Sequence, residues 1–201
     1  MQLVPNSRYS HFVAELKKVR RPFSEWKGLL FRASPLTHAQ AAKLLNGQGS
    51  LALGGRWLAA GTFPAVNLST DQATCLAESG ASFTYYNWAP SDVRPKIVVA
   101  VQARFLKVIN LVAPKGLQTK PWMELDQFLA EDWHKVNYAN HEAQSQAFGR
   151  AAHDIGAEAL LIPSVRVPAG VNLVYFPQSL TARSKVNLLG QDDLNQWLKK
   201  K

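Results

Sequence analysis

The chain has 201 residues, of which 47% are hydrophobic and 18% charged, so it suits one domain with a sizeable core and global disorder is excluded. No apolar run reaches the roughly 20 residues that a membrane-spanning helix needs, and residues 1–10 lack the apolar centre of a signal peptide. Its single cysteine, Cys75, excludes an internal disulfide and cysteine-rich metal sites. We therefore expect a cytoplasmic protein without membrane contact.

The basic charge is concentrated at the two ends of the sequence. The formal net charge is +9, from 23 basic and 14 acidic side chains. Residues 1–32 hold seven Lys or Arg against two acids, and residues 183–201 hold five against two, so the middle is close to neutral. Basic ends can bind phosphates, a membrane surface or an acidic partner, but most are simply solvated. We expect no specific nucleic-acid binding by this chain alone, although a basic binding module stays open as an alternative.

Helical spacing and capping residues predict three helices in the first 80 residues. They are expected at residues 12–19, where Pro22 ends the pattern, at residues 37–46, where Thr37 is the N-cap, and at residues 69–80, where Ser69 and Gln72 form a capping box and Gly80 is the stop. Cys75 lies on the apolar stripe of the third helix. We therefore interpret it as a packing thiol and not as a nucleophile.

Strands and helices alternate irregularly in the rest of the sequence. Strands are predicted at residues 97–101, at 108–112 as a continuation or partner of the first, and at 159–162 and 171–176, while helices are predicted from Pro121 to Trp133 and from His141 to Ile155, before Gly156. Because there is no regular strand–helix–strand rhythm, we expect an α+β fold with a mixed, mainly antiparallel sheet flanked by helices. A single domain over residues 1–201 is expected, with a basic N-terminal helix and a C-terminal helical tail.

Common catalytic signatures are absent from the sequence. It contains no phosphate-binding P-loop, no G-x-S-x-G nucleophile turn and no H-E-x-x-H zinc motif, and its five histidines are dispersed. The sequence therefore disfavours metal catalysis, and we expect neither a metal site nor a bound cofactor. A site made of carboxylates alone has no spacing by which it could be recognised.

Three short stretches carry the candidate chemistry. Gly54 and Gly55 allow a sharp turn and a close approach of a ligand, and Arg56 beside them can offer a planar fork to phosphate. Glu78 follows apolar residues of its predicted helix. A carboxylate near a buried apolar stripe is expected to have a hydrogen-bonding or charged partner, or to take part in a functional site. Ser164 follows an apolar strand at a turn. Each also has a structural interpretation: a tight turn with a surface arginine, a solvated glutamate at a helix end, and a turn serine.

The order and surroundings of these stretches resemble a known family, the RES domain. The resemblance covers about residues 28–178 and rests on Asn46-Gly-Gln-Gly49, Gly54-Gly-Arg-Trp57, Gly61-Thr-Phe-Pro64, Ala77-Glu78, and the passage from Gly156 through Pro163-Ser164 to Val171-Asn172. The family is named for its Arg, Glu and Ser and forms the toxin half of RES–Xre toxin–antitoxin pairs. The resemblance implies a fold related to the ADP-ribosyltransferase toxins and NAD as a consumed substrate.

The resemblance also implies roles for individual residues. Arg56, Glu78 and Ser164 match the three catalytic positions, and Arg32, in Phe31-Arg32-Ala33, matches a further arginine of many members. Arg32, Arg56 and Asn67 are the residues expected to bind NAD. Many members carry a tyrosine where this sequence has Asn67, and an amide can hydrogen-bond a ribose or a carboxamide but cannot stack as a phenol does.

The implied activity is cleavage of the nicotinamide–ribose bond of NAD. Water as acceptor would make a glycohydrolase and phosphate a phosphorylase, whereas transfer to a protein side chain would make an ADP-ribosyltransferase. The sequence leaves the acceptor open, because it depends on the shape of the site. A cognate Xre-type antitoxin is the implied partner, and a basic nucleic-acid or protein binding module is the non-enzymatic alternative.

Overall fold

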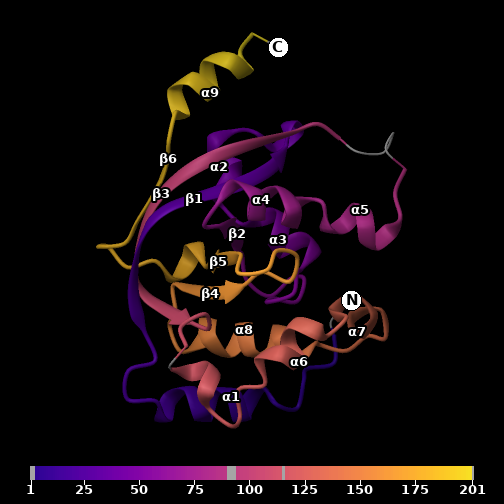
Figure 1. Ribbon diagram of the computed structural model, residues 1–201, viewed down its shortest axis with the longest axis vertical. Helices are drawn as coiled ribbons and strands as arrows, with labels where there is room; N and C mark the ends of the chain where they lie inside the picture. The colour runs from indigo at the N-terminus through magenta and orange to yellow at the C-terminus, as the bar shows by residue number, and fades with distance from the viewer. Residues whose placement is uncertain (1–2, 90–93, 115, 201) are drawn as a thin grey trace.

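The computed structural model describes residues 3–89, 94–114 and 116–200. Its helices and strands, labelled in Figure 1, follow one another as α1 (Tyr9–Lys18), β1 (Ser24–Pro35), α2 (Ala41–Leu44), α3 (Gln48–Leu53), β2 (Val66–Ser69), α4 (Gln72–Ser79), α5 (Ala81–Tyr86), β3 (Lys96–Asn110), α6 (Leu125–Ala130), α7 (Trp133–Tyr138), α8 (Gln144–Asp154), β4 (Ala159–Pro163), β5 (Val171–Tyr175), β6 (Lys185–Leu188) and α9 (Gln191–Leu198). Single 3-10 turns lie at Leu36–His38, Leu117–Thr119 and Pro177–Ser179.

The strands form one strongly curved sheet in the order β1-β2-β5-β4-β3-β6, and β1 also pairs with β3. Because β1 also pairs with β3, the strands β1, β2, β5, β4 and β3 form a closed ring. Strand β6 lies outside this ring and pairs with β3. The β3–β4 pairing is parallel, and the other pairings recorded among the described residues are antiparallel. The expectation of an α+β fold with a mixed, mainly antiparallel sheet is confirmed.

Two hydrophobic cores lie on the two faces of this sheet. One fills the space between the sheet and helices α1, α6 and α8, where Phe12 meets Phe128 and Phe148 edge to face at 5.5 and 5.7 Å between ring centroids. Helix α8 lies directly against the sheet in Figure 1, with α1 beyond it. The second core lies inside the curve of the sheet and includes Leu30, Phe105 and Tyr175.

One end of strand β4 is fastened by a buried carboxylate, Glu158, which is 0% exposed. Its Oε2 accepts the backbone N–H groups of Leu106 and Lys107 at 2.6 and 3.2 Å. Its Oε1 accepts the N–H of Thr181 at 2.8 Å and the hydroxyl of Ser184 at 2.6 Å. Glu158 thus ties β4 both to β3 and to the segment that leads into β6.

The helix predicted over residues 69–80 is confirmed as α4, although it begins later, at Gln72. The expected basic N-terminal helix is α1, residues 141–155 contain α8, and the C-terminal tail forms α9. The helix predicted over residues 37–46 is wrong. A 3-10 turn at Leu36–His38 is followed by the short helix α2, with Leu44 as its buried residue.

The capping box at Ser69 is also wrong. Ser69 is the last residue of β2 and pairs with Asn172 of β5. The N-cap of α4 is Asp71, whose Oδ1 accepts the backbone N–H of Thr74 at 2.8 Å. Because Ser69 is paired in the sheet, helix α4 begins only after β2 has ended.

The helix predicted from Pro121 to Trp133 is two helices in the structure. Helix α6 begins at Leu125 and ends at Ala130, and α7 begins at Trp133 with Asp132 as its N-cap. The carbonyl groups freed near the break are bound by Arg56, as described below. Residues 97–101 and 108–110 belong to one continuous strand, β3, which ends two residues before the predicted end at residue 112. Strands β1, β2 and β6 had no sequence prediction.

No helix in the described part of the chain is long and apolar enough to cross a membrane.

Candidate functional site

Two of the three predicted catalytic side chains are in direct contact. Glu78 lies on the last turn of α4, which follows β2 after two residues and runs back towards the start of β5. Its Oε1 accepts the hydroxyl of Ser164 at 2.6 Å and the side-chain amide of Asn172 at 2.7 Å. Oε2 accepts no hydrogen bond from the residues that the structure describes, and it is not among the buried atoms left without a partner, so it reaches solvent.

The turn that follows β4 fixes the hydroxyl group of Ser164. While its Oγ donates to Glu78, it accepts the backbone N–H groups of Arg166 and Val167 at 3.0 and 3.1 Å. The turn packs tightly on α4, because a Cβ atom at Gly170 would lie 2.6 Å from Oγ1 of Thr74. Ser164 therefore presents its proton to Glu78 and its oxygen to the turn, and it is a positioned donor and not a free nucleophile.

A second layer of side chains lies behind Glu78. The Oδ1 of Asn172 accepts the hydroxyl of Ser69 at 2.7 Å, and Ser69 is 4% exposed. Ser69 and Asn172 face each other in the antiparallel register of β2 and β5. A hydrogen-bonded row therefore runs from Ser69 through Asn172 to Glu78, on the same face of the sheet.

Arg56 makes no hydrogen bond to this row but is close enough to Glu78 for their charges to interact. It follows the turn at Gly54, whose φ of 73° favours glycine, and its Nη1 donates to the carbonyl oxygens of Phe128 at 2.7 Å and Glu131 at 2.9 Å. Burial lowers the pKa of the Arg56 guanidinium, and the negative charges of Glu131 and Glu78 raise it in part. Nε and Nη2 donate to no partner among the described residues and are not completely buried, so they remain available to a ligand.

Arg32 occupies a different place from the other predicted residues. It lies on β1, and its Nη1 donates to the carbonyl of Asn67 at 3.1 Å, bridging β1 to β2 where the two strands share the single register pair Phe31–Ser69. Burial lowers the pKa of Arg32, while Tyr175 and Cys75 raise it. Its Nε is buried without a partner among the described residues. The described contacts do not join Arg32 to Arg56, Glu78 or Ser164, and its role in NAD binding stays a prediction.

The side chain of Asn67 is exposed at the edge of the same row. Because side chains alternate along a strand, Asn67 and Ser69 lie on one face of β2, and Ser69 leads through Asn172 to Glu78. Asn67 can therefore reach a ligand that touches Glu78. Whether it binds NAD stays a prediction.

Comparison with known proteins gives the family of this chain. A family model described as the RES domain matches residues 29–195. The chain belongs to the RES domain family. Seven chains of solved structures are similar to this RES domain. One of them, in the crystal structure of the M. tuberculosis MbcT–MbcA toxin–antitoxin complex, has a TM-score of 0.65 and 20% sequence identity, over 98% of this chain and 99% of that chain.

These likenesses confirm the α+β fold class of the ADP-ribosyltransferase-like kind. No curated protein sequence matches the chain. The family match is longer at its C-terminal side than residues 28–178, over which the motifs were recognised.

Aromatic side chains of this RES domain join helices α5 and α7. The hydroxyl of Tyr85 donates to Asp132 at 3.0 Å, and that of Tyr86 lies 3.1 Å from Nδ1 of His134. The rings of Tyr85 and His134 stack at 4.3 Å, and burial lowers the pKa of His134. Since Tyr85 and Tyr86 are engaged with α7 and Trp57 is buried in the helical core, these rings have other partners than Asn67.

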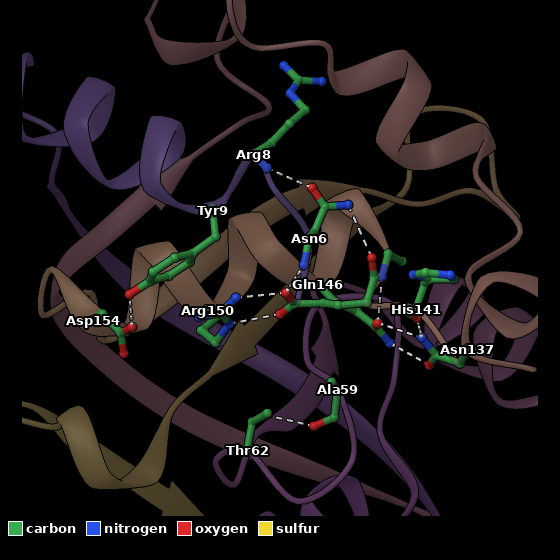
Figure 2. Close-up of polar contacts among 12 residues, drawn as sticks. Asn6, Arg8, Tyr9, Ala59, Thr62, Asn137, His141, Gln146, Arg150 and Asp154 are labelled. Atoms are coloured by element: carbon green, nitrogen blue, oxygen red, sulfur yellow. Dashed lines mark hydrogen bonds and ion pairs between the residues drawn. The ribbon is translucent and has the colours of Figure 1, made fainter. Parts of the chain in front are cut away.

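A hollow of about 430 Å³ lies elsewhere, beside the N-terminal segment, and is lined by Leu3, Pro5, Ala59, Ala60, Gly61, Thr62, Glu142 and Arg150. Arg150 donates to both carboxylate oxygens of Glu142 at 2.8 and 2.7 Å, and Glu142 also accepts the N–H of Asn6. In Figure 2 the side chains of Tyr9 and Asp154 meet beside Arg150, and their oxygens are 2.6 Å apart. Because the charges at this hollow already satisfy one another, we interpret it as structural.

Sequence reasoning missed the residues that complete the candidate site. Asn172 belongs to the motif that resembles the RES domain, but the motif gives it no role. The sequence predicts Ser69 as a helix cap. The contacts of both depend on the register between β2 and β5, which the sequence does not display. The expected packing role of Cys75 agrees with the structure, where the thiol is 5% exposed and burial raises its pKa.

Proposed function

We propose that this RES domain is a toxin that degrades NAD by breaking the bond between nicotinamide and ribose. The observation that carries the proposal is the carboxylate of Glu78, held by Ser164 through Oε1 while Oε2 faces solvent within the electrostatic field of Arg56. The same three residues are the ones that the family's name denotes.

The chemistry of this bond suits a site with one held carboxylate. Nicotinamide leaves as a neutral molecule, so no strong acid is needed, and the ribose passes through an oxocarbenium-like transition state. A carboxylate oxygen beside C1′ stabilises the positive charge as it develops. Oε2 of Glu78 takes this role in the proposal, and Nε and Nη2 of Arg56 bind the diphosphate, whose oxygens match a planar fork.

The acceptor completes the reaction. With water, NAD gives nicotinamide, ADP-ribose and a proton, and with phosphate it gives nicotinamide and a phosphorylated ADP-ribose. Transfer to a protein side chain, as in an ADP-ribosyltransferase, is the alternative outcome for the same bond cleavage. No separate cofactor is required in any of the three.

A toxin of this kind requires an inhibitor in its own cell. The similar solved structure is that of a toxin–antitoxin complex, which supports the proposal that an antitoxin, of the Xre type that the family implies, binds this chain in the cytoplasm. The basic ends, including Lys17 and Lys18 of α1, would assist association with an acidic partner, and salt would weaken that effect.

The proposal is tested by incubating the purified protein with NAD and measuring free nicotinamide, with a Glu78→Gln variant purified in parallel. Release by the wild type alone is expected. Equal release by both proteins would show that Glu78 is not the acting carboxylate, and none by the wild type would favour the basic binding module. NAD labelled in its adenylate half then separates the acceptors, because label stays with the protein only if ADP-ribose is transferred to it.

A further inference from the structure

Glu78 is held on one oxygen only, and both donors that hold it are neutral. The Ser164 hydroxyl and the Asn172 amide converge on Oε1 at 2.6 and 2.7 Å, while Oε2 reaches solvent. Hydrogen bonds on one oxygen restrict the rotation of the carboxyl group and leave the second oxygen with its charge unshared. A side chain at the last turn of a short helix needs such support, because an exposed glutamate otherwise samples several rotamers.

Asn172 is itself fixed in the only orientation that allows it to donate to Glu78. Its Oδ1 accepts the Ser69 hydroxyl at 2.7 Å, so its Nδ2 must face the opposite way, towards Glu78. Ser69 is almost fully buried, and it directly faces Asn172 in the β2–β5 register. An amide turned by 180° would place its oxygen against Oε1 of Glu78 and lose that hydrogen bond, whereas the Ser69 hydroxyl could still accept from Nδ2, so the acceptor-only carboxylate of Glu78 selects this orientation.

We propose that Asn172 is a positioning residue for the proposed reaction: supported from behind by the hydroxyl of Ser69, it holds Oε1 of Glu78 so that Oε2 is the oxygen that faces the ribose. Ser164 holds the same oxygen from the other side. This inference rests on the proposed cleavage of NAD. It assigns Asn172 and Ser69 to the machinery of Glu78 without any contact of their own to the substrate.

Replacing Asn172 should slow the chemical step and leave substrate binding nearly intact. For Asn172→Ala we expect kcat to fall about tenfold with KM within about twofold, because the lost hydrogen bond acts on a group that serves the transition state. Ser69→Ala should lower kcat by only a few-fold, since Asn172 keeps its bond to Glu78. A kcat for Asn172→Ala within about twofold of the wild type would overturn the proposal.

A matched asparagine controls for simple loss of stability. Asn6 likewise donates through Nδ2, to the carbonyl of Glu142 at 3.1 Å. It accepts through Oδ1 from the N–H of Arg8 at 3.0 Å, a contact drawn in Figure 2. Asn6→Ala should lower the urea midpoint of unfolding to a similar extent as Asn172→Ala, without changing kcat per folded molecule. If both variants lowered kcat equally, the role of Asn172 would be purely structural.

Asn172→Asp gives a readout that a structural role would not produce. The new carboxyl group has the same shape but can donate to Glu78 only when protonated, and when it is ionised near neutral pH it repels the carboxylate of Glu78 instead of holding it. Three cations lie around this carboxylate: Arg56 couples to it electrostatically, Lys96 donates to the carbonyl of Ser79, and Arg166 donates to that of Ala81. The hydrogen-bond donors of Glu78 itself, Ser164 and Asn172, are neutral in the wild type. The kcat of this variant relative to wild type should therefore be lowest near neutral pH and rise several-fold as the pH is lowered towards about 5. A flat ratio would contradict the proposal.

One measurement keeps the two proposals separable. If the wild type releases no nicotinamide, the proposed function fails. The hydrogen bond between Asn172 and Glu78 is then tested by the stability of the variants alone. The urea midpoints of Asn172→Ala, Glu78→Gln and the double variant should be non-additive, because contacting residues couple. Additive midpoints would overturn the hold of Asn172 on Glu78 whether or not NAD is cleaved.

Discussion

Two glutamates, one near each end of strand β4, differ in how many hydrogen bonds their carboxylate oxygens accept. At its start, Glu158 receives two hydrogen bonds on each oxygen and is completely buried. At its end, Ser164 bonds Glu78, whose Oε1 receives two hydrogen bonds and whose Oε2 none from the described residues. The six residue steps from Glu158 to Ser164 span about 20 Å of extended chain.

This difference separates a structural carboxylate from one that can act. A carboxylate with all its acceptor positions filled stabilises the fold and has nothing left for a substrate, whereas one held on a single oxygen is oriented and still reactive. Neutral donors add orientation without cancelling the charge, which an ion pair such as Glu142–Arg150 does. The two glutamates flanking β4 should therefore respond to mutation in opposite ways.

The largest effect is expected at Glu78. Glu78→Gln keeps the size of the side chain and removes its charge, so turnover of NAD should fall about 10²–10³-fold, as for the loss of an electrostatic transition-state contact. Thermal melting and circular dichroism should stay close to those of the wild type. A variant that turns over NAD within a few-fold of the wild type would show that this carboxylate is not the acting one.

Glu158→Gln should show the reverse pattern. The amide cannot accept on both sides, so one end would face two backbone N–H groups with N–H groups of its own, and we expect a loss of about 2–4 kcal/mol of unfolding free energy. Turnover per folded molecule should be unchanged because the site lies at the other end of the strand. Loss of activity without loss of stability would contradict the comparison.

The pH dependence of stability tests the same carboxylate. Burial raises the pKa of Glu158, but the bonds from Ser184, Thr181 and Leu106 outweigh it and hold the pKa below its ordinary value. A carboxyl whose pKa is depressed by folding stabilises the protein above its unfolded pKa and loses that contribution as the pH falls through its folded pKa. The stability difference between wild type and Glu158→Gln should therefore shrink between about pH 6 and pH 3, as chemical denaturation would measure.

Arg56 combines the two kinds of role, because Nη1 binds the Phe128 and Glu131 carbonyls while Nε and Nη2 have no partner among the described residues. Arg56→Lys keeps the charge but loses the planar pair Nε and Nη2 that is proposed to bind the diphosphate, so we expect about a tenfold loss in kcat/KM, nearly as large as for Arg56→Ala. Steady-state kinetics of both variants would measure it. Should lysine restore most of the activity, Arg56 acts as a point charge only.

The elements that the sequence predicted are those whose own residues carry the pattern. Helix α8 and strands β3, β4 and β5 are apolar enough to be recognised alone, whereas β1 contains Gly28 and Arg32 and becomes a strand through its long pairing with β3. Strand β2 has four residues, too few for a pattern. Such strands are defined by partners far away in the chain.

The candidate site divides in the same way. Arg56, Glu78 and Ser164 were recognisable because each lies in a short local motif, and the structure joins the last two across 86 residues. Asn172 and Ser69 are 103 residues apart and act through strand register, which local patterns do not encode. The break between α6 and α7 likewise follows from the carbonyl groups that Arg56 binds, not from a residue that ends a helix.

The smallest expected effect concerns Asn67, where the chain departs from its family. Its side chain is exposed on the face of β2 that leads to Glu78, and the aromatic residues nearby in sequence, Tyr85, Tyr86 and Trp57, have partners elsewhere. A tyrosine there has room to pack against the nicotinamide or its ribose, which would add on the order of 1 kcal/mol. Asn67→Tyr should therefore lower KM for NAD several-fold, or raise kcat, with an unchanged melting temperature.

Asn67→Ala is the matched variant for this test. The carbonyl of residue 67 still accepts the bond from Arg32 in both variants, so the link between β1 and β2 is preserved and only the side chain differs. If the amide binds the ribose or the carboxamide, Asn67→Ala should raise KM while Asn67→Tyr lowers it. A stable but inactive Asn67→Tyr beside a fully active Asn67→Ala would instead show that the new ring blocks the approach to Glu78, and that position 67 lies outside the nicotinamide contact.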